Sequence, residues 1–552
     1  MELDYVCVKF SYTVHCIAVL VIIKEVCKPT VMDSTHLAIL TALLFMLPSL
    51  EGARILALMN LPSPSHTFFS RTLSRALARR GHQVLEISPD VDREPTPNRT
   101  SIHMEGIYDA LTKHFKNEDF TNYSALGSMY VLSDWSEIVC GAELQSEGGQ
   151  ELLGLSPSET FDVIITDMSL NECFYGFISK FGSPPVIGIS SHGVLPWTST
   201  FMGTPENPSY MPHYLLSYSD RMSFIQRLYN FIVVNYMNYY VYEYHIVLKQ
   251  EVIARRYFKE ELQSYWNLER NFSLFLANTL FGLDYSRPLS PNVIPVGGMH
   301  LKRISDPLPR DLKRILDEAK DGFIFLSLGT NLQFGRIHKE KVRAFLEVFA
   351  SLPQRILVKS GSNDLAGVPV PPNVFVRDWF PQDGVLAHPN IRIFITHCGR
   401  LSMMEAIYRE VPIIGMPFIL DQHANMRIML ERGIAVKLDY NSLTKEDVLS
   451  AVKEITRNHS YRENVRKLSA ILRDHADTAL DRAVFWTEYV IRHRGAPHLR
   501  PASTELYWYQ HLLLDVMLVL LALVIVTVLA LYYAFSSCCR FAKSTMKHRK
   551  ID

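Results

Sequence analysis

The chain has 552 residues, of which 48% are hydrophobic and 20% are charged, so it is long enough for two or three domains with apolar cores. Its 56 Lys and Arg residues equal its 56 Asp and Glu residues, and the formal net charge is zero. A nucleic-acid-binding protein usually carries a basic surplus or a basic face, which this sequence shows only at its extreme C-terminus, so nucleic acid is excluded as an expected partner.

The first predicted element is the apolar stretch His36–Leu50, which is followed by small residues around Ala53. It is short for a membrane span, and this anatomy is typical of a signal peptide with cleavage near Ala53. A further apolar run, Cys7–Ile23, lies upstream, so either Met32 is the working start or the N-terminus is anchored as well. Residues 1–53 are therefore interpreted as an N-terminal extension and signal peptide.

Residues 54–285 alternate between short apolar strands and helices, as a Rossmann-like domain does. Arg54–Met59 predicts a strand. Apolar residues at helical spacing then predict a helix from about His66 to Arg80, ended by Gly81. The other elements expected in this half are strands at Gln83–Ile87, Phe161–Thr166 and Pro185–Ser190 and a helix near Asn171–Phe181.

One segment of this half, Met222–Tyr244, is rich in aromatic residues and carries few charges. Two placements fit that composition. The segment is either a buried helix or a helix that lies against a membrane surface, and the pattern alone does not choose between them.

A stretch dense in Pro and Gly, Asp284–His300, predicts a linker at residues 286–302. Residues 303–495 repeat the alternating design and form a second predicted Rossmann-like domain. Its expected strands are Gly322–Leu328, Arg355–Lys359, Val374–Arg377, Arg392–Thr396, Pro412–Met416 and Ile434–Leu438. The predicted fold class is thus α/β, with two domains facing a cleft, and ligands are expected outside the carboxyl ends of the strands.

After a juxtamembrane segment at residues 496–511, Leu512–Phe535 supplies the roughly 20 apolar residues that a membrane span needs. Tyr and Trp residues flank it like an interfacial belt, and the basic tail at 536–552 predicts a cytosolic C-terminus with the body in the lumen. Arg549–Asp552 resembles a retrieval signal of the endoplasmic reticulum, so a single-pass type I protein of that membrane is expected. Four glycosylation sequons fit a lumenal body: Asn98, Asn122, Asn271 and Asn458.

The sequence contains few features that predict disulfide bonds or a metal site. The body carries only Cys140, Cys173 and Cys398, which is no disulfide framework, so its stability is expected to come from buried apolar cores. No Asp-x-Asp cluster or His/Cys spacing indicates a metal site, and no metal is expected.

The block Phe394–Asn425 is the most informative part of the chain. A buried strand is predicted to end at His397, and a helix is predicted to follow after a tight turn. Free N–H groups and the partial positive charge of a helix N-terminus suit a diphosphate. Glu405 lies about one turn into that helix, within reach of a ribose. Asp421 beside Gln422 suits hydrogen bonding to sugar hydroxyls.

The order T-H-x-G, S-x-x-E, P-I-I-G-x-P and D-Q in this block resembles the signature of the UDP-glycosyltransferase family. The resemblance extends to Ser327–Thr330, Trp379–Gln382 and Arg287–Gly298, and it covers the chain from about Ala53 to the C-terminus. The residues of the signature look most like those of insect members of the membrane-bound animal branch. It implies a GT-B fold and an enzyme that uses a UDP-sugar as co-substrate, with no cofactor.

The resemblance also implies a donor-site residue set, and the positions that match are Ser327, Thr330, Trp379, Gln382, His397, Gly399, Ser402, Glu405, Asp421 and Gln422. Trp379 would stack on uracil and Gln382 would hold the uridine. Glu405 would bind ribose, and Asp421 with Gln422 would grip the transferred sugar. His397 and the backbone N–H groups past Gly399 would hold the diphosphate. Ser327 and Thr330 either line it or serve only the loop geometry.

The sequence departs from the family pattern in the turn after His397. Cys398 stands where Gly is usual, and it is interpreted as a small filler of the turn. Leu401 stands where Asn is common, and it cannot donate the hydrogen bond that Asn makes. Phosphate contacts at this turn are therefore expected from Ser402 and Arg400.

The first half is expected to supply the base. A hydroxyl becomes a better nucleophile as it loses its proton, and His is the usual acceptor of that proton at neutral pH. By resemblance, His66 is the base, and Asp167, at the end of the strand Phe161–Thr166, orients the imidazole and stabilises its cation. Taken alone, His66 would be read as a helix-entry residue and Asp167 as a helix cap.

The resulting hypothesis is inverting transfer of a sugar, with glucose favoured over glucuronate, to a hydroxyl of small lipophilic acceptors for detoxification. Two alternatives stay open: glycosylation of one endogenous steroid, pigment or lipid, and a catalytically silent lipophile-binding protein on the same scaffold. The expected partners are the UDP-sugar, the acceptor, the membrane and, as an open option, a second copy of the chain.

Overall fold

The computed structural model describes residues 52–548 except 115–124, 260, 331 and 362. The predicted signal peptide and the sequon at Asn122 lie outside the described residues. The chain from Ala53 onward forms one compact unit built on two parallel sheets. We call each sheet, together with the helices that cover it, the first lobe and the second lobe.

The sheet of the first lobe has seven strands in the order β3-β2-β1-β4-β5-β6-β7, and every neighbouring pair is parallel. Its strands are β1 (Arg54–Leu58), β2 (Gln83–Ser88), β3 (Arg99–His103), β4 (Val163–Asp167), β5 (Val186–Ser190), β6 (Leu274–Ala277) and β7 (Val293–Pro295). The central strands β4 and β5 are buried along their whole length, because helices cover a parallel sheet on both faces.

The sheet of the second lobe has six parallel strands in the order β10-β9-β8-β11-β12-β13. They are β8 (Phe323–Ser327), β9 (Arg355–Lys359), β10 (Val374–Arg377), β11 (Ile391–Thr396), β12 (Ile413–Gly415) and β13 (Ala435–Lys437). Each was predicted from the sequence to within two residues, because each is a short run of apolar residues. Two sheets with helices on their faces confirm the predicted α/β class.

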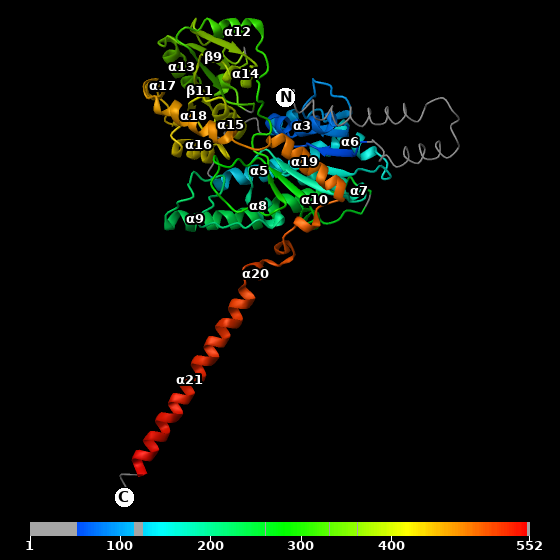
Figure 1. Cartoon of the computed structure of the whole chain (residues 1–552), viewed down its shortest axis with the longest axis vertical. Helices are drawn as coiled ribbons and strands as arrows, with labels where there is room; N and C mark the ends of the chain where they lie inside the picture. The colour runs from blue at the N-terminus through cyan, green and yellow to red at the C-terminus, as the bar shows by residue number, and fades with distance from the viewer. Residues whose placement is uncertain (1–51, 115–124, 260, 331, 362, 549–552) are drawn as a thin grey trace, which may run out of the picture. The chain divides into compact units, whose positions relative to one another are not determined.

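Helices fill both lobes (Figure 1). The first lobe contains α3 (Pro64–Arg79), α4 (Ile107–His114), α5 (Ala125–Gln145), α6 (Glu147–Gly154), η2 (Glu172–Tyr175), α7 (Gly176–Lys180), α8 (Pro196–Met202), α9 (Phe224–Asn235), η3 (Tyr236–Val247), α10 (Leu248–Ala254) and α11 (Tyr265–Arg270). The second lobe contains α12 (Arg310–Asp317), η4 (Phe334–Arg336), α13 (Lys339–Ala350), α14 (Gln382–Leu386), α15 (Arg400–Tyr408), α16 (Gln422–Glu431), α17 (Lys445–Arg457) and α18 (Ser460–Arg473).

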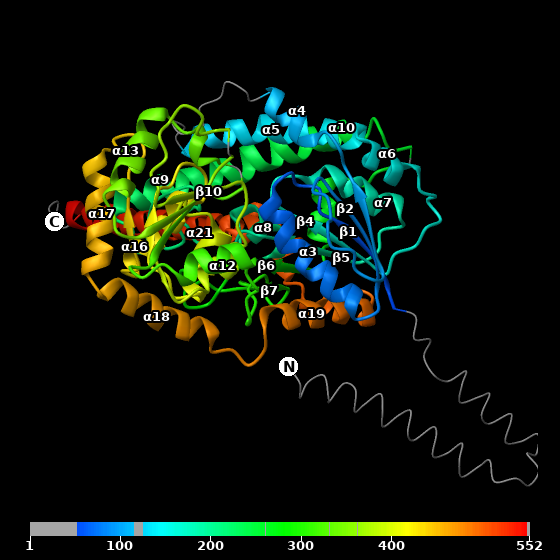
Figure 2. The ribbon, with the colours of Figure 1, turned by 90° about the horizontal axis from the view of Figure 1, so that it is seen from above.

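The chain crosses between the lobes more than once, which differs from the predicted boundaries. The expected linker at 286–302 contains β7, which extends the first sheet beside β6. The helix α19 (Ala479–His493), expected in the second domain, packs on α3 of the first lobe, where Glu488 accepts a hydrogen bond of 2.8 Å from Arg80. Figure 2 shows α19 beside α3.

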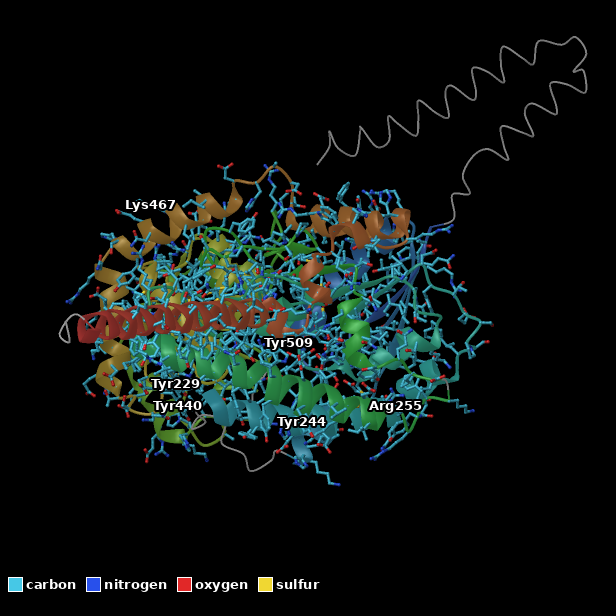
Figure 3. The ribbon with its side chains drawn as sticks, turned by 90° about the horizontal axis from the view of Figure 1, so that it is seen from below. Tyr229, Tyr244, Arg255, Tyr440, Lys467 and Tyr509 are labelled. Atoms are coloured by element: carbon cyan, nitrogen blue, oxygen red, sulfur yellow. A yellow bond between two sulfur atoms is a disulfide. The ribbon has the colours of Figure 1, made fainter. Side chains whose placement is uncertain are left out.

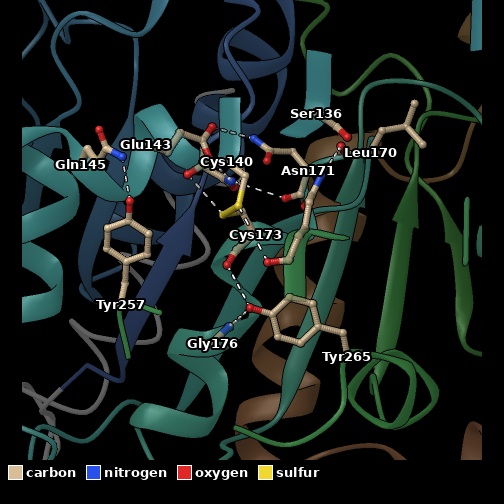
Figure 4. Close-up of a disulfide and its surroundings, with 12 residues drawn as sticks. Ser136, Cys140, Glu143, Gln145, Leu170, Asn171, Cys173, Gly176, Tyr257 and Tyr265 are labelled. Atoms are coloured by element: carbon tan, nitrogen blue, oxygen red, sulfur yellow. Dashed lines mark hydrogen bonds between the residues drawn. A yellow bond between two sulfur atoms is a disulfide. The ribbon is translucent and has the colours of Figure 1, made fainter. Parts of the chain in front are cut away.

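One disulfide joins Cys140 of α5 to Cys173 of η2 (Figure 4). The sequence predicted no disulfide framework, and this single bond was not predicted. A spacing of 33 residues carries no signal by itself, and the two cysteines meet because α5 and η2 both pack against α10. Cys398 is a free, buried cysteine.

The segment Met222–Tyr244 belongs to a longer helical run made of α9, η3 and α10. Val233, Met237 and Val241 face the core of the first lobe and are buried, whereas Phe231 and Tyr240 are exposed. The run is therefore buried on one side only.

The C-terminal part leaves the first lobe through η5 (Pro497–Leu499), η6 (Ala502–Glu505) and α20 (Trp508–His511) and enters the helix α21 (Leu514–His548). Within α21, residues Leu514–Lys543 are long and apolar enough to cross a membrane, and an 18-residue window within them has a mean hydropathy of 3.0. This agrees with the predicted C-terminal span.

Candidate active site

The imidazole of His66 and the carboxylate of Asp167 meet at the carboxyl edge of the first sheet. They follow β1 and β4, which are neighbours although the chain between them forms two other strands. Such a reversal of strand order is where α/β sheets bind ligands. His66 Nδ1 lies 3.4 Å from Asp167 Oδ2, and both side chains are buried. The backbone N–H of Ser169 donates to Asp167 Oδ1 at 2.8 Å, which fixes the carboxylate.

A second imidazole, which the sequence analysis missed, stands beside the first. His192 follows β5, and its ring centroid lies 4.9 Å from that of His66. Its Nδ1 lies 3.8 Å from Oδ2 of Asp421 in the second lobe. Burial lowers the pKa of His192 to about 4, so the ring is neutral at pH 7. A lone His after a strand carries no sequence signal that would have singled it out.

The second lobe repeats this arrangement at its own reversal of strand order, between β8 and β11. Ser327 ends β8, and His397 follows β11. The ring of His397 is held between two glycines: a Cβ on Gly329 would lie 2.5 Å from its Cε1, and one on Gly399 would lie 2.4 Å from its Nε2. A side chain at either position would therefore displace the imidazole. Burial lowers the pKa of His397 to about 4, so it offers a neutral N–H.

The helix α15 begins directly after this imidazole. Its N-cap, Gly399, has no side chain that could bond the first N–H groups, so these remain available to a ligand. Cys398 precedes it with φ at 69°, in the left-handed region that favours glycine. Its buried Sγ packs against Met426, which agrees with the interpretation of Cys398 as a small filler of the turn.

The predicted uridine residues also come together. The side-chain NH2 of Gln382 donates to Glu405 Oε2 at 2.6 Å and to Ser402 Oγ at 3.0 Å. Burial raises the pKa of Glu405 to about 7. Trp379, at the end of the neighbouring loop, leaves 66% of its surface exposed, which is unusual for so large an aromatic side chain unless it binds something.

Lys359 is a second residue that sequence reasoning missed. It ends β9, its ammonium lies 4.3 Å from the centroid of the Trp379 ring, and it donates to the carbonyl of Gly329 at 2.9 Å. Burial lowers its pKa to about 8, so at pH 7 it places a positive charge beside the glycine loop. The strand Arg355–Lys359 was predicted, but nothing in its pattern showed that the last residue points at the site.

Asp421 and Gln422 lie where α16 begins. Asp421 Oδ2 accepts a hydrogen bond of 2.7 Å from Asn425. The amide oxygen of Gln422 accepts from the backbone N–H groups of Phe418 and Ile419, at 2.8 and 3.2 Å. These bonds orient both side chains. Gln422 can then offer its NH2 group to a ligand as a donor, and Asp421 can offer its carboxylate as an acceptor.

Arg400 does not take the phosphate-binding role expected of it. Its guanidinium donates to the carbonyl oxygen of Asn278 and to both carboxylate oxygens of Asp284, at 2.6 to 3.0 Å. Both partners belong to the segment that follows β6, so the first residue of α15 ties the second lobe to the first. The expected phosphate contact is wrong for this residue, because its charge is already neutralised.

Taken together, these contacts form a continuous polar chain from one lobe to the other. It runs from Asp167 through His66 and His192 to Asp421. An imidazole–carboxylate pair can accept a proton from a hydroxyl, and a glycine-lined helix end can hold a diphosphate. Within the described ranges, no group of three or more His, Cys, Asp or Glu side chains is arranged to hold a metal ion.

Two parallel sheets whose functional ends meet in this way form the two-lobed architecture of the GT-B fold. The solved structure of spinosyn forosaminyltransferase SpnP has the same fold: the match covers 80% of this chain and 99% of that chain, with a TM-score of 0.54 and 15% identity. The chain belongs to the UDP-glycosyltransferase family, because the family described as "UDP-glucoronosyl and UDP-glucosyl transferase" matches residues 58–550.

Curated relatives agree over nearly their full length. UDP-glucosyltransferase 2 of Dactylopius coccus is 35% identical over 88% of this chain and 93% of that relative. UDP-glucuronosyltransferase 1A5 of Rattus norvegicus is 30% identical over 91% of this chain and 95% of that relative. The protein is therefore a UDP-glycosyltransferase enzyme, and the predicted resemblance is confirmed.

Proposed function

We propose that this enzyme transfers glucose from UDP-glucose, with inversion, to a hydroxyl group of small lipophilic acceptors. One observation carries the proposal: the imidazole of His66, paired with Asp167 in the first lobe, lies one side chain away from Asp421 of the second lobe. A hydroxyl bound next to His66 would therefore face a sugar held by Asp421.

The chemistry follows from the two nitrogens of His66. When Nδ1 donates its proton to Asp167, Nε2 carries the lone pair that takes the acceptor's proton. The acceptor oxygen attacks the anomeric carbon, the bond from that carbon to the diphosphate oxygen breaks, and UDP leaves with the electron pair. Asp167 stabilises the imidazolium while it exists. Attack opposite the leaving group turns an α-linked donor into a β-glycoside.

The second lobe holds the leaving group in this proposal. Trp379 stacks on uracil, Gln382 holds the uridine, and Glu405 accepts hydrogen bonds from ribose. The N–H groups at Gly399 and Ser402 bind the diphosphate as it gains charge.

Other groups of the second lobe complete the diphosphate and sugar contacts. The N–H of His397 and the ammonium of Lys359 bind the diphosphate, which Ser327 and Thr330 line. Asp421 and Gln422 grip the transferred sugar, with His192 as a third contact from the first lobe.

Two arguments favour glucose over glucuronate. The relative at 35% identity is a glucosyltransferase by its printed name, whereas the glucuronosyltransferases are 29 to 30% identical. In addition, the low pKa of His192 makes it a neutral hydrogen-bonding partner, which suits a sugar hydroxyl better than a carboxylate that needs a counter-charge.

The proposed location is the lumenal face of the endoplasmic reticulum, with a cleaved signal peptide and a type I orientation. Its support is the apolar helix α21, in whose C-terminal part Arg540 and Lys543 supply positive charge on the side that stays cytosolic. Conjugation of lipophilic compounds at a membrane, for their clearance, is the role that fits this placement.

The test is an assay of the full-length protein in membranes with labelled UDP-glucose and UDP-glucuronate against a panel of phenols and steroids. We expect transfer from UDP-glucose to many phenols. Transfer to one steroid, pigment or lipid alone would replace the broad role by a specific one. UDP binding without transfer to any acceptor would favour a silent lipophile-binding protein and overturn the proposal.

A further inference from the structure

The helical run of α9, η3 and α10 carries apolar side chains on the side that faces away from the core. Ile225 is 68% exposed, Phe231 is 56% exposed and Tyr244 is 64% exposed. Phe224, Ile232 and Tyr240 are exposed on the same side. Figure 3 shows Tyr229 and Tyr244 along this run. Such a continuous apolar surface is rare on a protein that meets only water.

A polar residue of the run is buried on the side that faces the core. Asn230, on the inner side of α9, is buried, and its NH2 group donates to the carbonyl oxygens of Pro208 and Met211 at 2.8 Å. Its amide oxygen accepts from the backbone N–H of His213 at 2.8 Å. An ordinary surface helix buries its apolar stripe and exposes its polar one. Here apolar side chains lie on the outer side of the run as well as on the buried inner side, so an apolar phase is expected outside.

The anchor of the chain indicates which phase this is. Ser503 donates from its Oγ to the carbonyl oxygen of Gly203 at 3.3 Å, directly after α8, and α8 contacts η3. The chain thus leaves the first lobe next to the helical run. Only residues 506–513 connect this point to α21, and a segment of that length spans at most about 28 Å. The bilayer that holds α21 is therefore within reach of the run.

We propose that the outer face of α9, η3 and α10 lies in the interface of the membrane that α21 crosses. Phe224, Ile225 and Ile232 enter the acyl boundary, and Tyr240 and Tyr244 sit at the level of the headgroups, where tyrosine rings are preferred. Arg227, the exposed cation of α9, donates one hydrogen bond to the carbonyl oxygen of Met222, and its other N–H groups would meet the lipid phosphates.

This contact orients the enzyme on its membrane. The first lobe rests on lipid, and the donor-binding second lobe is left to face water, where a charged UDP-sugar is dissolved. The contact is inferred from the exposed apolar side chains of the run and from the short connection to α21, so it can be tested independently of which sugar is transferred.

The test uses the full chain with Cys7, Cys16, Cys27, Cys538 and Cys539 replaced by Ser and reconstituted in phosphatidylcholine vesicles. An environment-sensitive fluorophore is attached in one variant at Ile232→Cys and in a matched control at Lys467→Cys, an exposed position of α18. Cys398 is buried and stays unlabelled. Because α21 holds both variants on the vesicle, attachment alone cannot produce a difference between them.

We expect the fluorophore at position 232 to emit at shorter wavelength and to lose intensity several-fold when the vesicles contain a lipid-borne quencher, with no change at position 467. Equal, weak quenching at both positions would overturn the proposal. A short-wavelength signal that vanishes on dilution to one chain per vesicle, with a crosslink between two Ile232→Cys chains, would assign the face to a second copy and would also overturn it.

Discussion

The two lobes place candidate functional groups at the same kind of position in a parallel sheet, but the groups differ. Each places its functional groups where the strand order of a parallel sheet reverses, after β1 and β4 in the first lobe and after β8 and β11 in the second. The first lobe uses two side chains from distant segments, His66 and Asp167. The second lobe uses backbone N–H groups, glycines and a block of neighbouring residues. Binding a diphosphate through the backbone demands small residues at fixed spacing, whereas a base demands only one imidazole in the right place.

The largest effect is expected from His66→Ala, which removes the base and leaves the second lobe intact. Turnover should fall by roughly 10²- to 10⁴-fold, whereas calorimetry should give the same affinity for UDP-glucose as the parent. His82→Ala is the matched control, because His82 lies near the other end of α3 and contacts Glu488 rather than the site. If the His66→Ala enzyme had parental turnover, His66 would not be the base, and the proposed division of roles between the lobes would be wrong.

Arg400→Met tests the tie between the lobes. Asp284 would keep its charge with only the backbone N–H of Leu280 as a partner, so the melting temperature should drop by an amount that corresponds to about 3 kcal/mol. The double variant Arg400→Met, Asp284→Leu removes both charges and should recover part of that loss. If the single variant melts like the parent, the ion pair does not hold the lobes together.

Trp379→Ala should weaken UDP-glucose binding by about tenfold, the usual contribution of one aromatic ring stacked on a base. Since the ring is largely exposed, the melting temperature should not change. Trp266→Ala in the first lobe, where the ring is 44% exposed, provides the control and should leave the affinity unchanged. Equal effects of both variants would show that stacking is not the role of Trp379.

The pH dependence of donor binding tests Glu405, whose pKa burial raises to about 7. An ionised carboxylate accepts stronger hydrogen bonds from ribose, so the affinity for UDP-glucose should rise roughly tenfold between pH 6 and pH 8. Glu405→Gln should remove that rise. The folded protein holds this proton more tightly than the unfolded chain, so the same group should lower the stability as the pH rises from 4.5 to about 7. An unchanged pH profile in Glu405→Gln would exclude it as the titrating group.

The smallest effect is expected from His192→Ala, because a neutral hydrogen bond contributes only about 1 kcal/mol. The Michaelis constant for UDP-glucose should rise a few-fold while the affinity for UDP stays constant, since His192 lies beside Asp421, the proposed contact of the sugar. Loss of UDP affinity as well would mean that the residue supports the loop rather than the sugar.

The contrast between the lobes also explains what the sequence could predict. The apolar strands of the second sheet and the block Phe394–Asn425 are local patterns, from which the strands of the second lobe and a candidate donor site could be predicted. The edge strand Arg99–His103 is mostly exposed and polar, and Val293–Pro295 lies among prolines, so neither shows the periodicity of a strand.

Contacts between distant segments could not be predicted for the same reason. The partners of Arg400 lie more than one hundred residues away, as do those of His192, and Cys140 meets Cys173 only through helix packing. Such contacts depend on tertiary structure, which leaves no periodic mark in the chain.

The most direct test is a structure of the full chain with UDP-glucose and an unreactive acceptor analogue bound. The account predicts the diphosphate on the N–H groups of Gly399 and Ser402, the glucose against Asp421 and Gln422, and the analogue's hydroxyl position within hydrogen-bonding distance of His66 Nε2. A sugar bound on the second lobe but pointing away from His66, with another side chain next to the hydroxyl, would contradict it.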